Sequence, residues 1–588
     1  MNPRYYRVRI LRDIARACLV PQLLVLGVLY LTHWSPAPLL RTLLHLIAIP
    51  VVGASKVWYS SYKNARIAAS LGAVPVPCVR GKWPGNLDIA IRLVRSINDD
   101  YLSIKAMADL FDEYGSNTVN TRILWADQFL SKSDQNIRYM LSGEGFEWFE
   151  KGYYWRERFE SFLGNGIFNR DKQEWANHRA IARPWFAKDR VSDLNLFDRH
   201  TAHTFDFIAS FSQSQQAFDI QDLLGRFTLD VSSEFLFGSC LNTLDGALPV
   251  AGMAKMGPKG SSIDDEFGTF AWAFEDLQLK TGTRSIIGKF WPLLELFKDQ
   301  TTESNKIVHG YLKGLVENAL KEKARAGTQG GRKDEEKTFL SHLVDSTDDA
   351  EAIRFQVLNM LLAGRDTTAI TLTFVVYFLT IYPDISDRLR EEILDEYGVD
   401  GQPTMDTMRK LKYLRAVIDE TLRFFPPVPV NLRISDSNPH TYPASDSDNA
   451  PKYYVPPNTE ILYNTALMHR RPDLWGDDAE EFRPDRWLEP DVIKKVTNNP
   501  WMYIPFHAGP RVCLGQNFAY NEMSFFLVRL LQRFHRFELA RDAQPPASLP
   551  PANWKTLKGR PAIEKVWPSI SITPYIKGGL WIRAIAAE

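Results

Sequence analysis

An apolar run near the N-terminus constrains the fold more than any other feature of this sequence. Residues 17–34 (ACLVPQLLVLGVLYLTHW) contain no Asp, Glu, Lys or Arg. As a helix this run would span roughly 27 Å at about 1.5 Å per residue, close to the thickness of a bilayer core. A cleaved signal peptide is the rival interpretation, but no small-x-small cleavage site follows the run. We therefore predict a retained transmembrane anchor, preceded by five arginines: Arg4, Arg7, Arg9, Arg12 and Arg16.

A second apolar stretch, residues 39–54, is shorter and carries Arg41 and His45. Three basic residues follow it: Lys56, Lys63 and Arg66. Basic residues on both outer flanks favour a hairpin of two spans with both ends in the cytosol. The alternative is one span followed by a helix that lies on the membrane surface. Residues 1–60 are thus predicted to be a membrane anchor with one or two transmembrane segments.

The remaining residues, 61–588, are predicted to form one large catalytic domain, because the sequence has no internal repeat and no long low-complexity linker. The 70 basic and 70 acidic residues balance, which argues against nucleic acid as a partner. The four cysteines are scattered and none has C-x-x-C spacing. A disulfide framework or a structural zinc site is therefore not expected.

The pattern of apolar residues predicts a mainly α-helical domain with small β-sheets. Residues 355–380 are dense in apolar side chains and predict one long buried helix. Short extended segments are predicted near 426–434, 452–463 and 566–586. Two polar interruptions, 242–265 and 323–337, predict loops.

One cysteine lies in a segment with unusual local chemistry. In FHAGPRVCLG (506–515), Gly509 and Pro510 favour a tight turn, and Gly515 opens a strongly helical run at 516–534. A cysteine just before a helix N-terminus has its thiolate stabilised by the helix dipole. Arg511 adds a nearby cation, and Phe506 can shield the sulfur from water. These features suit a thiolate ligand for a redox metal, although an inert buried cysteine fits the composition equally.

The order Phe506-x-x-Gly509-x-Arg511-x-Cys513-x-Gly515 resembles the heme-binding signature of cytochromes P450. The resemblance covers roughly residues 60–588. It implies the fold of that family, with heme b buried between a long central helix and the cysteine loop. It also implies that Cys513 is the axial ligand of the iron and that Phe506, Arg511 and Gly515 contact the cofactor.

The predicted long helix contains AGRDTT at 363–368, which matches the oxygen-activation motif of the same family. Gly364 would let the helix backbone approach a flat cofactor. Thr367 can donate a hydrogen bond back into the helix or toward bound oxygen. Asp366 supplies a carboxylate that can relay protons. The resemblance implies that Asp366 and Thr367 deliver protons; the alternative is a polar kink in a core helix.

Glu420 and Arg423 are three residues apart in a predicted helix and therefore share one face. In the family this pair is joined by a downstream arginine, here Arg486 in FRPDRW, and the three form a structural network beneath the heme. Asp485 and Trp487 depart from the usual downstream motif. Neither change affects the arginine.

WANHR (175–179) matches the Trp-x-x-x-Arg helix of the family. Trp175 and Arg179 are four residues apart and would point to one side of a helix, where both can hold a heme propionate. Arg433 and Arg511 occupy matching propionate-binding positions. Each arginine taken alone also fits an ordinary surface position.

The resemblance implies a monooxygenase that inserts one oxygen atom from O2 into a C–H bond of a hydrophobic substrate. No flavin or nicotinamide fingerprint is present, so we expect electrons from NADPH through a separate membrane-bound P450 reductase. The expected location is the endoplasmic reticulum membrane, with the catalytic domain facing the cytosol.

The second half of the chain resembles membrane-bound fungal hydroxylases of n-alkanes and fatty acids. Small aliphatic residues at Ala363, Val428 and Val430 would leave a narrow apolar channel suited to a chain end. We therefore expect ω-hydroxylation, although the valines also fit ordinary core strand positions. The rival functions are a broad xenobiotic or polycyclic-aromatic oxidase, a reductase-independent hydroperoxide isomerase, and a heme carrier without turnover.

Overall fold

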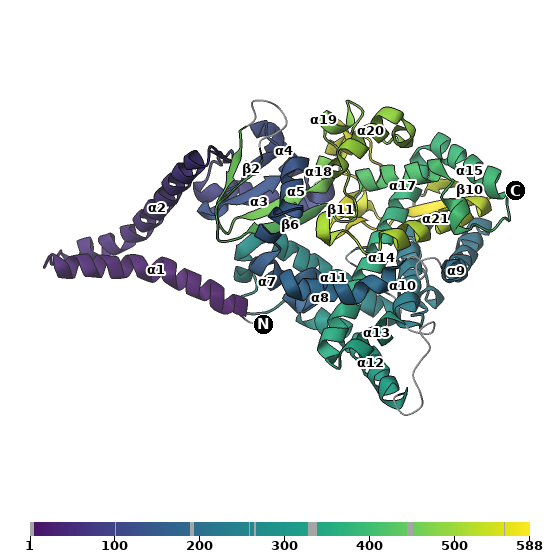
Figure 1. Cartoon of the computed structure of the whole chain (residues 1–588), viewed down its shortest axis with the longest axis horizontal. Helices are drawn as coiled ribbons and strands as arrows, with labels where there is room; N and C mark the ends of the chain where they lie inside the picture. The colour runs from purple at the N-terminus through teal and green to yellow at the C-terminus, as the bar shows by residue number, and fades with distance from the viewer. Residues whose placement is uncertain are drawn as a thin grey trace.

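A computed structural model describes residues 5–99, 101–187, 193–253, 255–257, 259–263, 266–326, 338–443, 451–557 and 559–587. Two long helices, α1 (Tyr5–Leu31) and α2 (Pro38–Ser70), extend away from a mainly helical body (Figure 1). Both are long and apolar enough to cross a membrane, and only 6% of each apolar window is buried. Both apolar runs of the sequence therefore lie in helices, and α2 continues to Ser70, past the expected end of the anchor.

The body is dominated by helices, as the apolar pattern predicted. Its α-helices are α3 (Leu87–Asp99), α4 (Lys105–Tyr114), α5 (Asp134–Leu141), α6 (Gly145–Trp148), α7 (Gly152–Leu163), α8 (Lys172–Ala182), α9 (Leu194–Gln213), α10 (Ile220–Phe237), α11 (Glu266–Ile287), α12 (Thr302–Ala326), α13 (Phe339–Ser346), α14 (Ala350–Ile381), α15 (Pro383–Tyr397), α16 (Met405–Met408), α17 (Lys412–Phe424), α18 (Thr465–Met468), α19 (Pro472–Trp475), α20 (Pro490–Asn498) and α21 (Gln516–Arg533).

The strands are short and form small sheets. They are β1 (Val74–Pro75), β2 (Thr118–Asn120), β3 (Gln128–Ser131), β4 (Phe149–Glu150), β5 (Phe218–Asp219), β6 (Val430–Ser435), β7 (His440–Thr441), β8 (Tyr453–Val455), β9 (Glu460–Asn464), β10 (Phe534–Leu539), β11 (Pro568–Ile570), β12 (Pro574–Ile576) and β13 (Trp581–Ala586). One sheet has the order β2-β3-β9-β6-β4, in which β3 and β9 are parallel. A second sheet has the order β10-β13-β5. The three predicted extended regions contain β6, β8, β9 and β11 to β13, and the prediction of small sheets is confirmed.

Helix α14 is the central element of the body. Its first turn is capped by Asp349, whose carboxylate accepts hydrogen bonds from the backbone N–H of Glu351 (3.0 Å) and Ala352 (3.1 Å). Residues 356–362 and 368–379 are buried, because α14 is apolar on nearly every side and contributes to both of the largest core clusters. The sequence predicted this helix at 355–380, and the structure extends it by a few residues at its N-terminus. Its middle, residues 363–367, is the part that the sequence associated with chemistry.

Candidate functional site

The cysteine loop is held by backbone geometry before the start of α21. The short 3-10 helix η12 (Gly509–Arg511) makes the predicted turn, and Gly509 has φ +68°. A Cβ atom at Gly509 would lie 1.9 Å from the carbonyl oxygen of Leu141, so only glycine fits there. The backbone N–H of Cys513 donates to the Phe506 carbonyl at 3.0 Å. Gly515 caps α21, which places Cys513 just ahead of a helix N-terminus, as predicted.

The electrostatics around Cys513 confirm one part of the sequence argument and correct another. Burial raises the pKa of the thiol, while the backbone N–H of Gly515 and the charge of Arg179 oppose that rise. The predicted cation was Arg511, but its guanidinium donates instead to Asp171 Oδ1 (2.7 Å) and to the Arg170 carbonyl (2.9 Å). Arg179 is thus the cation that acts on the sulfur.

Helix α8 brings the Trp-x-x-x-Arg residues to the same place. Arg179 donates from Nη1 to the Val512 carbonyl at 2.9 Å, next to Cys513. Trp175 is buried, and the guanidinium carbon of Arg511 lies 4.5 Å from the centre of its ring. The structure therefore gathers Trp175, Arg179 and Arg511 around the cysteine loop.

A buried cationic cluster lies beside this loop. Lys151 and Arg433 are buried, and Arg511 is only 10% exposed. The buried Asp171 is the nearby carboxylate that counters them, and it already accepts hydrogen bonds from the backbone N–H of Lys151 (3.0 Å) and Gly152 (2.9 Å). The three basic side chains therefore outnumber the one buried carboxylate beside them. Lys151 was not predicted from the sequence, because nothing marks this lysine until the chain folds.

Burial, and then the neighbouring cations, lower the pKa values of the basic groups in this cluster. Burial, then Arg511 and Arg433, lower the pKa of Lys151 well below its ordinary value. Burial and Arg433 lower the pKa of Arg511 to about 9. His507, whose Nε2 lies 3.2 Å from Arg433 and 2.6 Å from the Tyr463 hydroxyl, has its pKa lowered well below normal, mainly by burial. A ligand with two carboxylates would neutralise the cluster, and the two propionates of heme b fit this requirement.

The middle of α14 differs from the rest of that helix. Ala363, Gly364 and Thr367 are half-buried, whereas the helix on either side is buried. The Cys513 side chain is also accessible by its surface area, although it lies deep enough among protein atoms for desolvation to raise its pKa. The Thr367 hydroxyl donates to the Ala363 carbonyl at 2.7 Å, four residues back in the helix. This is one of the two arrangements predicted for Thr367. The accessible residues of α14 and the cysteine loop are those that the sequence assigned to the two sides of a heme.

Gly364 lies against α10, a contact that the sequence did not predict. A Cβ atom at this position would lie 2.4 Å from the Ser232 hydroxyl oxygen of α10. The Thr228 hydroxyl, one turn away on α10, donates to the Arg365 carbonyl at 2.9 Å. Glycine at 364 therefore also serves the close packing of α10 against α14, while its approach to a cofactor stays a prediction.

The Asp366 carboxylate is buried in an ion-pair network. Lys259 donates to it at 2.8 Å and Arg365 at 3.0 Å, and Lys259 also donates to Gln278 Oε1 (2.9 Å) and Thr573 Oγ1 (2.8 Å). Burial alone would raise the pKa of Asp366, but Lys259 and Arg365 outweigh it and hold the pKa below its usual value. Asp366 is thus ionised at neutral pH and held by Lys259, a partner that lies inside the predicted loop 242–265.

Glu522 of α21 is a buried acid that the sequence argument missed. Its carboxyl oxygens form no hydrogen bond with the described residues, and the nearby Thr368 side chain offsets burial only in part. Burial raises the pKa of Glu522 well above its ordinary value, which favours the protonated carboxyl. A single acid within the apolar face of α21 was the available signal.

The predicted Glu–Arg–Arg network is assembled and fully buried. Arg423 donates to both carboxylate oxygens of Glu420 at 2.9 Å, and Arg486 donates to Oε1 at 3.0 Å. All three side chains are 0% exposed. Trp487, noted as a departure from the family motif, donates its indole N–H to Glu420 Oε2 at 3.0 Å. The departure therefore adds a hydrogen bond, while Asp485 pairs with the partly exposed Arg388.

The residues predicted to face substrate lie at the start of β6 and on α14. Val428 is 39% exposed and Val430 is half-buried. The Val428 carbonyl accepts a hydrogen bond from the Thr465 hydroxyl at 3.0 Å, which fixes the backbone there. Their role toward a substrate stays a prediction.

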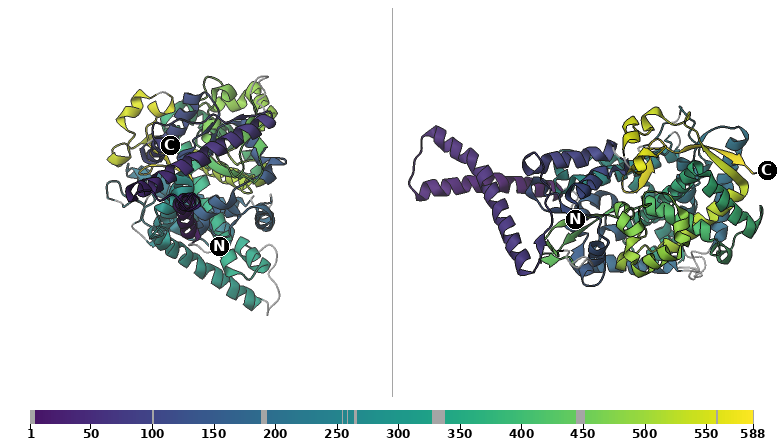
Figure 2. Two further views of the ribbon diagram at one scale, coloured as in Figure 1. Left: turned by 90° about the vertical axis from the view of Figure 1, so that its left-hand side faces the viewer. Right: turned by 90° about the horizontal axis from the view of Figure 1, so that it is seen from above.

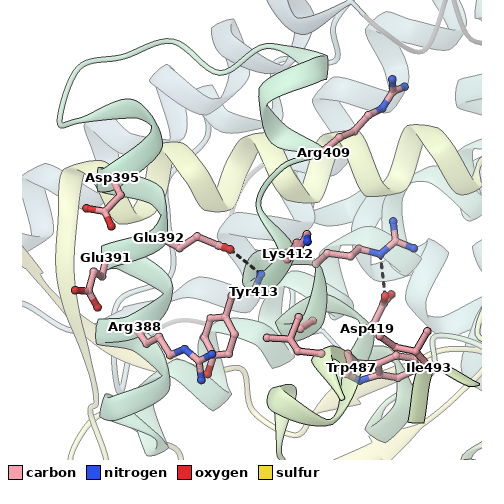
Figure 3. Close-up of a pocket in the computed structure, with 13 residues that line it drawn as sticks. Arg388, Glu391, Glu392, Asp395, Arg409, Lys412, Tyr413, Asp419, Trp487 and Ile493 are labelled. Atoms are coloured by element: carbon pink, nitrogen blue, oxygen red, sulfur yellow. Dashed lines mark hydrogen bonds and ion pairs between the residues drawn. The ribbon is translucent and has the colours of Figure 1, made fainter. Parts of the chain in front are cut away.

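A surface groove of about 800 Å³ lies between α15, α17 and the 3-10 helix η10 (Pro484–Leu488), and Figure 3 shows its lining. Charged side chains dominate it. Glu392 accepts from the backbone N–H of Tyr413 at 2.8 Å, and Arg415 pairs with Asp419 at 2.8 Å. An apolar substrate placed here would desolvate these charges without compensation. The groove contains none of the predicted heme or substrate residues.

A second cluster carries possible metal donors on α9 and α10. One donor atom each of His200, Asp230 and Cys240 lies within 4.8 Å of the others. Asp230 already accepts from the backbone N–H of Thr243 (2.8 Å) and Leu244 (3.0 Å), and His200 Nε2 lies 2.7 Å from Glu234. Hydrogen bonds within the protein therefore satisfy the His200 and Asp230 side chains, and their surroundings do not require a bound cation.

Comparison with known proteins agrees with this geometry. Residues 105–562 match the family described as Cytochrome P450. The chain is 35% identical to "Cytochrome P450 52E2" of Candida apicola, over 84% of this chain and 91% of that protein. It is 31% identical to "Cytochrome P450 52A6" of Candida tropicalis, over 88% of this chain and 94% of that protein. It is also 35% identical to "Cytochrome P450 monooxygenase g430" of a Fusarium species, over 82% and 83%. With a heme-thiolate signature, an assembled Glu–Arg–Arg network and relatives that match most of its length, this chain belongs to the cytochrome P450 family of monooxygenases.

Proposed function

We propose that this chain binds heme b through Cys513 and hydroxylates a linear fatty acid or n-alkane at or near its end. The observation that carries the cofactor assignment is the buried basic cluster beside the cysteine loop, whose side chains outnumber the buried carboxylate there and suit two propionates. Lys151, Arg433, Arg511 and Trp175 would hold the propionate side, and Cys513 would ligate the iron. When bound, the heme supplies O2 activation, which a thiolate ligand favours by donating electron density to the iron.

The proposed substrate class rests on the resemblance to fungal alkane and fatty-acid hydroxylases and on the small side chains at Ala363, Val428 and Val430. An apolar chain end requires a narrow, water-excluding path, and small aliphatic side chains leave that width. Two groups near this path can donate or accept protons. One is the Thr367 hydroxyl, and the other is the neighbouring Asp366 carboxylate, which accepts a hydrogen bond from Lys259.

Electrons are proposed to come from NADPH through a separate reductase, since P450 proteins use a redox partner. We place the chain in the endoplasmic reticulum membrane with its body facing the cytosol, where such a reductase and NADPH are available. The two apolar helices support membrane attachment.

Product analysis tests the substrate class. Membranes that contain this chain and a reductase are given dodecanoic acid, a linear alkane and a polycyclic arene. We expect terminal or near-terminal alcohols of the two linear substrates. Arene phenols with the linear substrates untouched would instead indicate a broad xenobiotic oxidase, and turnover of hydroperoxides without NADPH would indicate an isomerase.

Replacing Thr367 with alanine is expected to uncouple NADPH consumption from product formation. The hydroxyl is the half-buried proton donor on the accessible part of α14, and alanine removes it without changing the helix. We expect a loss of product per NADPH of about 100-fold, the lower end of the range for a lost proton donor, with peroxide released instead. The ratio of peroxide to alcohol measures this effect. Thr371→Ala is the matched control, because its hydroxyl bonds the Thr367 carbonyl one turn along; equal coupling in both variants would remove Thr367 from the mechanism.

Replacing Arg433 with leucine is expected to weaken heme retention. Arg433 is 1% exposed and its charge is one of three in the cluster. Loss of one charge-assisted contact should cost about 1.5–3 kcal/mol of heme affinity. The rate of heme transfer to apomyoglobin measures the change. Arg183→Leu, at an exposed position after α8, should transfer heme at the wild-type rate, and an unchanged rate in Arg433→Leu would exclude a propionate role.

A further inference from the structure

The two membrane helices contact each other inside their apolar runs. Gln22 of α1 donates from Nε2 to the His45 carbonyl of α2 at 3.1 Å, and His45 Nδ1 lies 2.5 Å from Gln22 Oε1. Gln22 and His45 are thus polar side chains inside the two runs that satisfy each other, whereas Arg41 lies near the start of α2. In hydrocarbon, unpaired polar groups are costly, and hydrogen bonds between helices offset that cost. This pairing favours two helices that lie together in the bilayer.

The first turns of α1, residues 5–10, precede the apolar run and pack against the catalytic body. Tyr6 and Ile10 are 4% and 3% exposed, whereas nearly all later residues of α1 are exposed. The Tyr6 ring lies 4.4 Å, between centroids, from the buried ring of Trp291. Trp291 belongs to the 3-10 helix η8 (Gly288–Leu293), which follows α11. Figure 1 shows the N-terminal end of α1 at the body, near α7.

Two arginines near the start of α1 bind the catalytic body. Arg9 donates from Nε and Nη2 to the two carboxylate oxygens of Glu157 at 2.8 and 2.7 Å, and both side chains are about 5% exposed. The Arg9 guanidinium also donates to the Lys289 carbonyl at 2.9 Å. Arg7 donates to the Glu295 carbonyl at 3.1 Å. Arg9 therefore links α7, which carries Glu157, to η8, and a buried bidentate pair of this kind requires a fixed geometry.

The far end of α2 is attached to the same body. Ala68 is fully buried against Ala73 and Tyr454. The backbone N–H of Val74 donates to the Lys452 carbonyl at 2.8 Å, where β1 pairs with β8. The start of α1 and the end of α2 thus both contact the body, and the turn between them, residues 32–37, lies far from it (Figure 2).

We infer that α1 and α2 cross the bilayer as a hairpin, and that residues 5–10 return to the cytosolic face as a docked segment that joins α7 to η8. The partner of the exposed apolar faces of the hairpin is a lipid bilayer. A single span would place the start of α1 and the body on opposite sides of the membrane, which the Arg9–Glu157 contact forbids. The charges agree, because five arginines precede the first run and Lys56, Lys63 and Arg66 follow the second, whereas the segment around the turn contains only Arg41. The inference does not depend on the substrate or the cofactor.

Cysteine labelling in sealed microsomes tests the two crossings. In the full chain, Cys18, Cys78 and Cys240 are replaced by serine and Cys513 is kept. One new cysteine is then introduced at a time, either in a tag ahead of Met1, at Ser35 or at Lys494. Ser35 and Lys494 are exposed. A membrane-impermeant maleimide should label the tag and Lys494→Cys directly, and Ser35→Cys only after detergent is added. Direct labelling of Ser35→Cys, or protection of the tag, would overturn the hairpin.

Cross-linking with a short bismaleimide tests the docked segment. Arg9→Cys with Glu157→Cys should be joined in membranes, because the linker replaces the two long side chains that meet in the native contact. Arg12→Cys with Glu157→Cys should be joined much less, because Arg12 is 47% exposed on another side of α1, and mass spectrometry of the linked peptides measures the difference. If the first pair does not accumulate as holoenzyme, Tyr5→Cys with Tyr153→Cys tests the same contact, as the centres of these rings lie 6.3 Å apart. Equal cross-linking of contact and control pairs would overturn the docking.

Discussion

Alanine in place of Cys513 is expected to abolish both the thiolate–CO spectrum of the reduced protein and its NADPH-dependent turnover. Cys513 precedes α21, where the Gly515 N–H and Arg179 both favour a negatively charged sulfur. Alanine leaves the backbone turn and the cationic cluster intact, so heme can still be retained, but without electron donation from a thiolate. The spectrum of carbon monoxide bound to the reduced membranes, before and after substitution, is the measurement.

Cys240→Ala provides the matched control. Cys240 is a partly buried cysteine whose thiol pKa is raised to about 12, mainly by burial, so it is an inert thiol in another part of the fold. This variant should keep the wild-type spectrum and turnover. A thiolate spectrum that survives in Cys513→Ala and is lost in Cys240→Ala would reassign the iron ligand.

Glutamine in place of Glu420 is expected to destabilise the body more than any other single change in the site. The substitution leaves Arg423 and Arg486 buried, at 0% exposure, without the carboxylate that pairs both of them. Breaking a buried ion pair by removing one partner costs about 3–5 kcal/mol. We expect a large loss of holoenzyme yield and a lower guanidinium midpoint, followed through the heme-thiolate spectrum.

Trp487→Phe separates the ionic network from its added hydrogen bond. It removes only the indole N–H that donates to Glu420, and phenylalanine is the residue usual in the family at this position. The expected loss is about 1 kcal/mol, the net value of one hydrogen bond. If Glu420→Gln unfolds at the same guanidinium concentration as Trp487→Phe, the network does not stabilise the fold.

Residues in short, spaced patterns could be placed from the sequence alone. The cysteine loop, the Trp175–Arg179 helix and the Glu420–Arg423–Arg486 network each depend on local spacing, and the structure assembles all three sets. Helix spacing places i and i+3 or i+4 side chains on one face whatever the rest of the fold does. The long apolar run of α14 was also predictable, because a helix that is apolar on all sides is stable only when it is buried.

Contacts between distant segments could not be predicted. Lys259 reaches Asp366 across 107 positions of sequence, and Lys151 meets Arg433 and Arg511 only in the folded chain. Such residues carry no periodic signal, and a lysine in a polar loop is ordinarily exposed. The one corrected explanation has the same origin, because Arg511 pairs with Asp171 of a distant loop, and the contact of Gly364 with Ser232 of α10 was not predictable for the same reason.

Isotope labelling shows whether this chain uses O2 and NADPH to hydroxylate a linear substrate. Membranes containing the chain and a reductase are incubated with dodecanoic acid, NADPH and 18O2, and the alcohols are analysed by mass spectrometry. We expect one 18O atom in each alcohol, bound at or near the chain end, and no product without NADPH. Alcohols that carry no 18O, or that form equally without NADPH, would exclude this reaction.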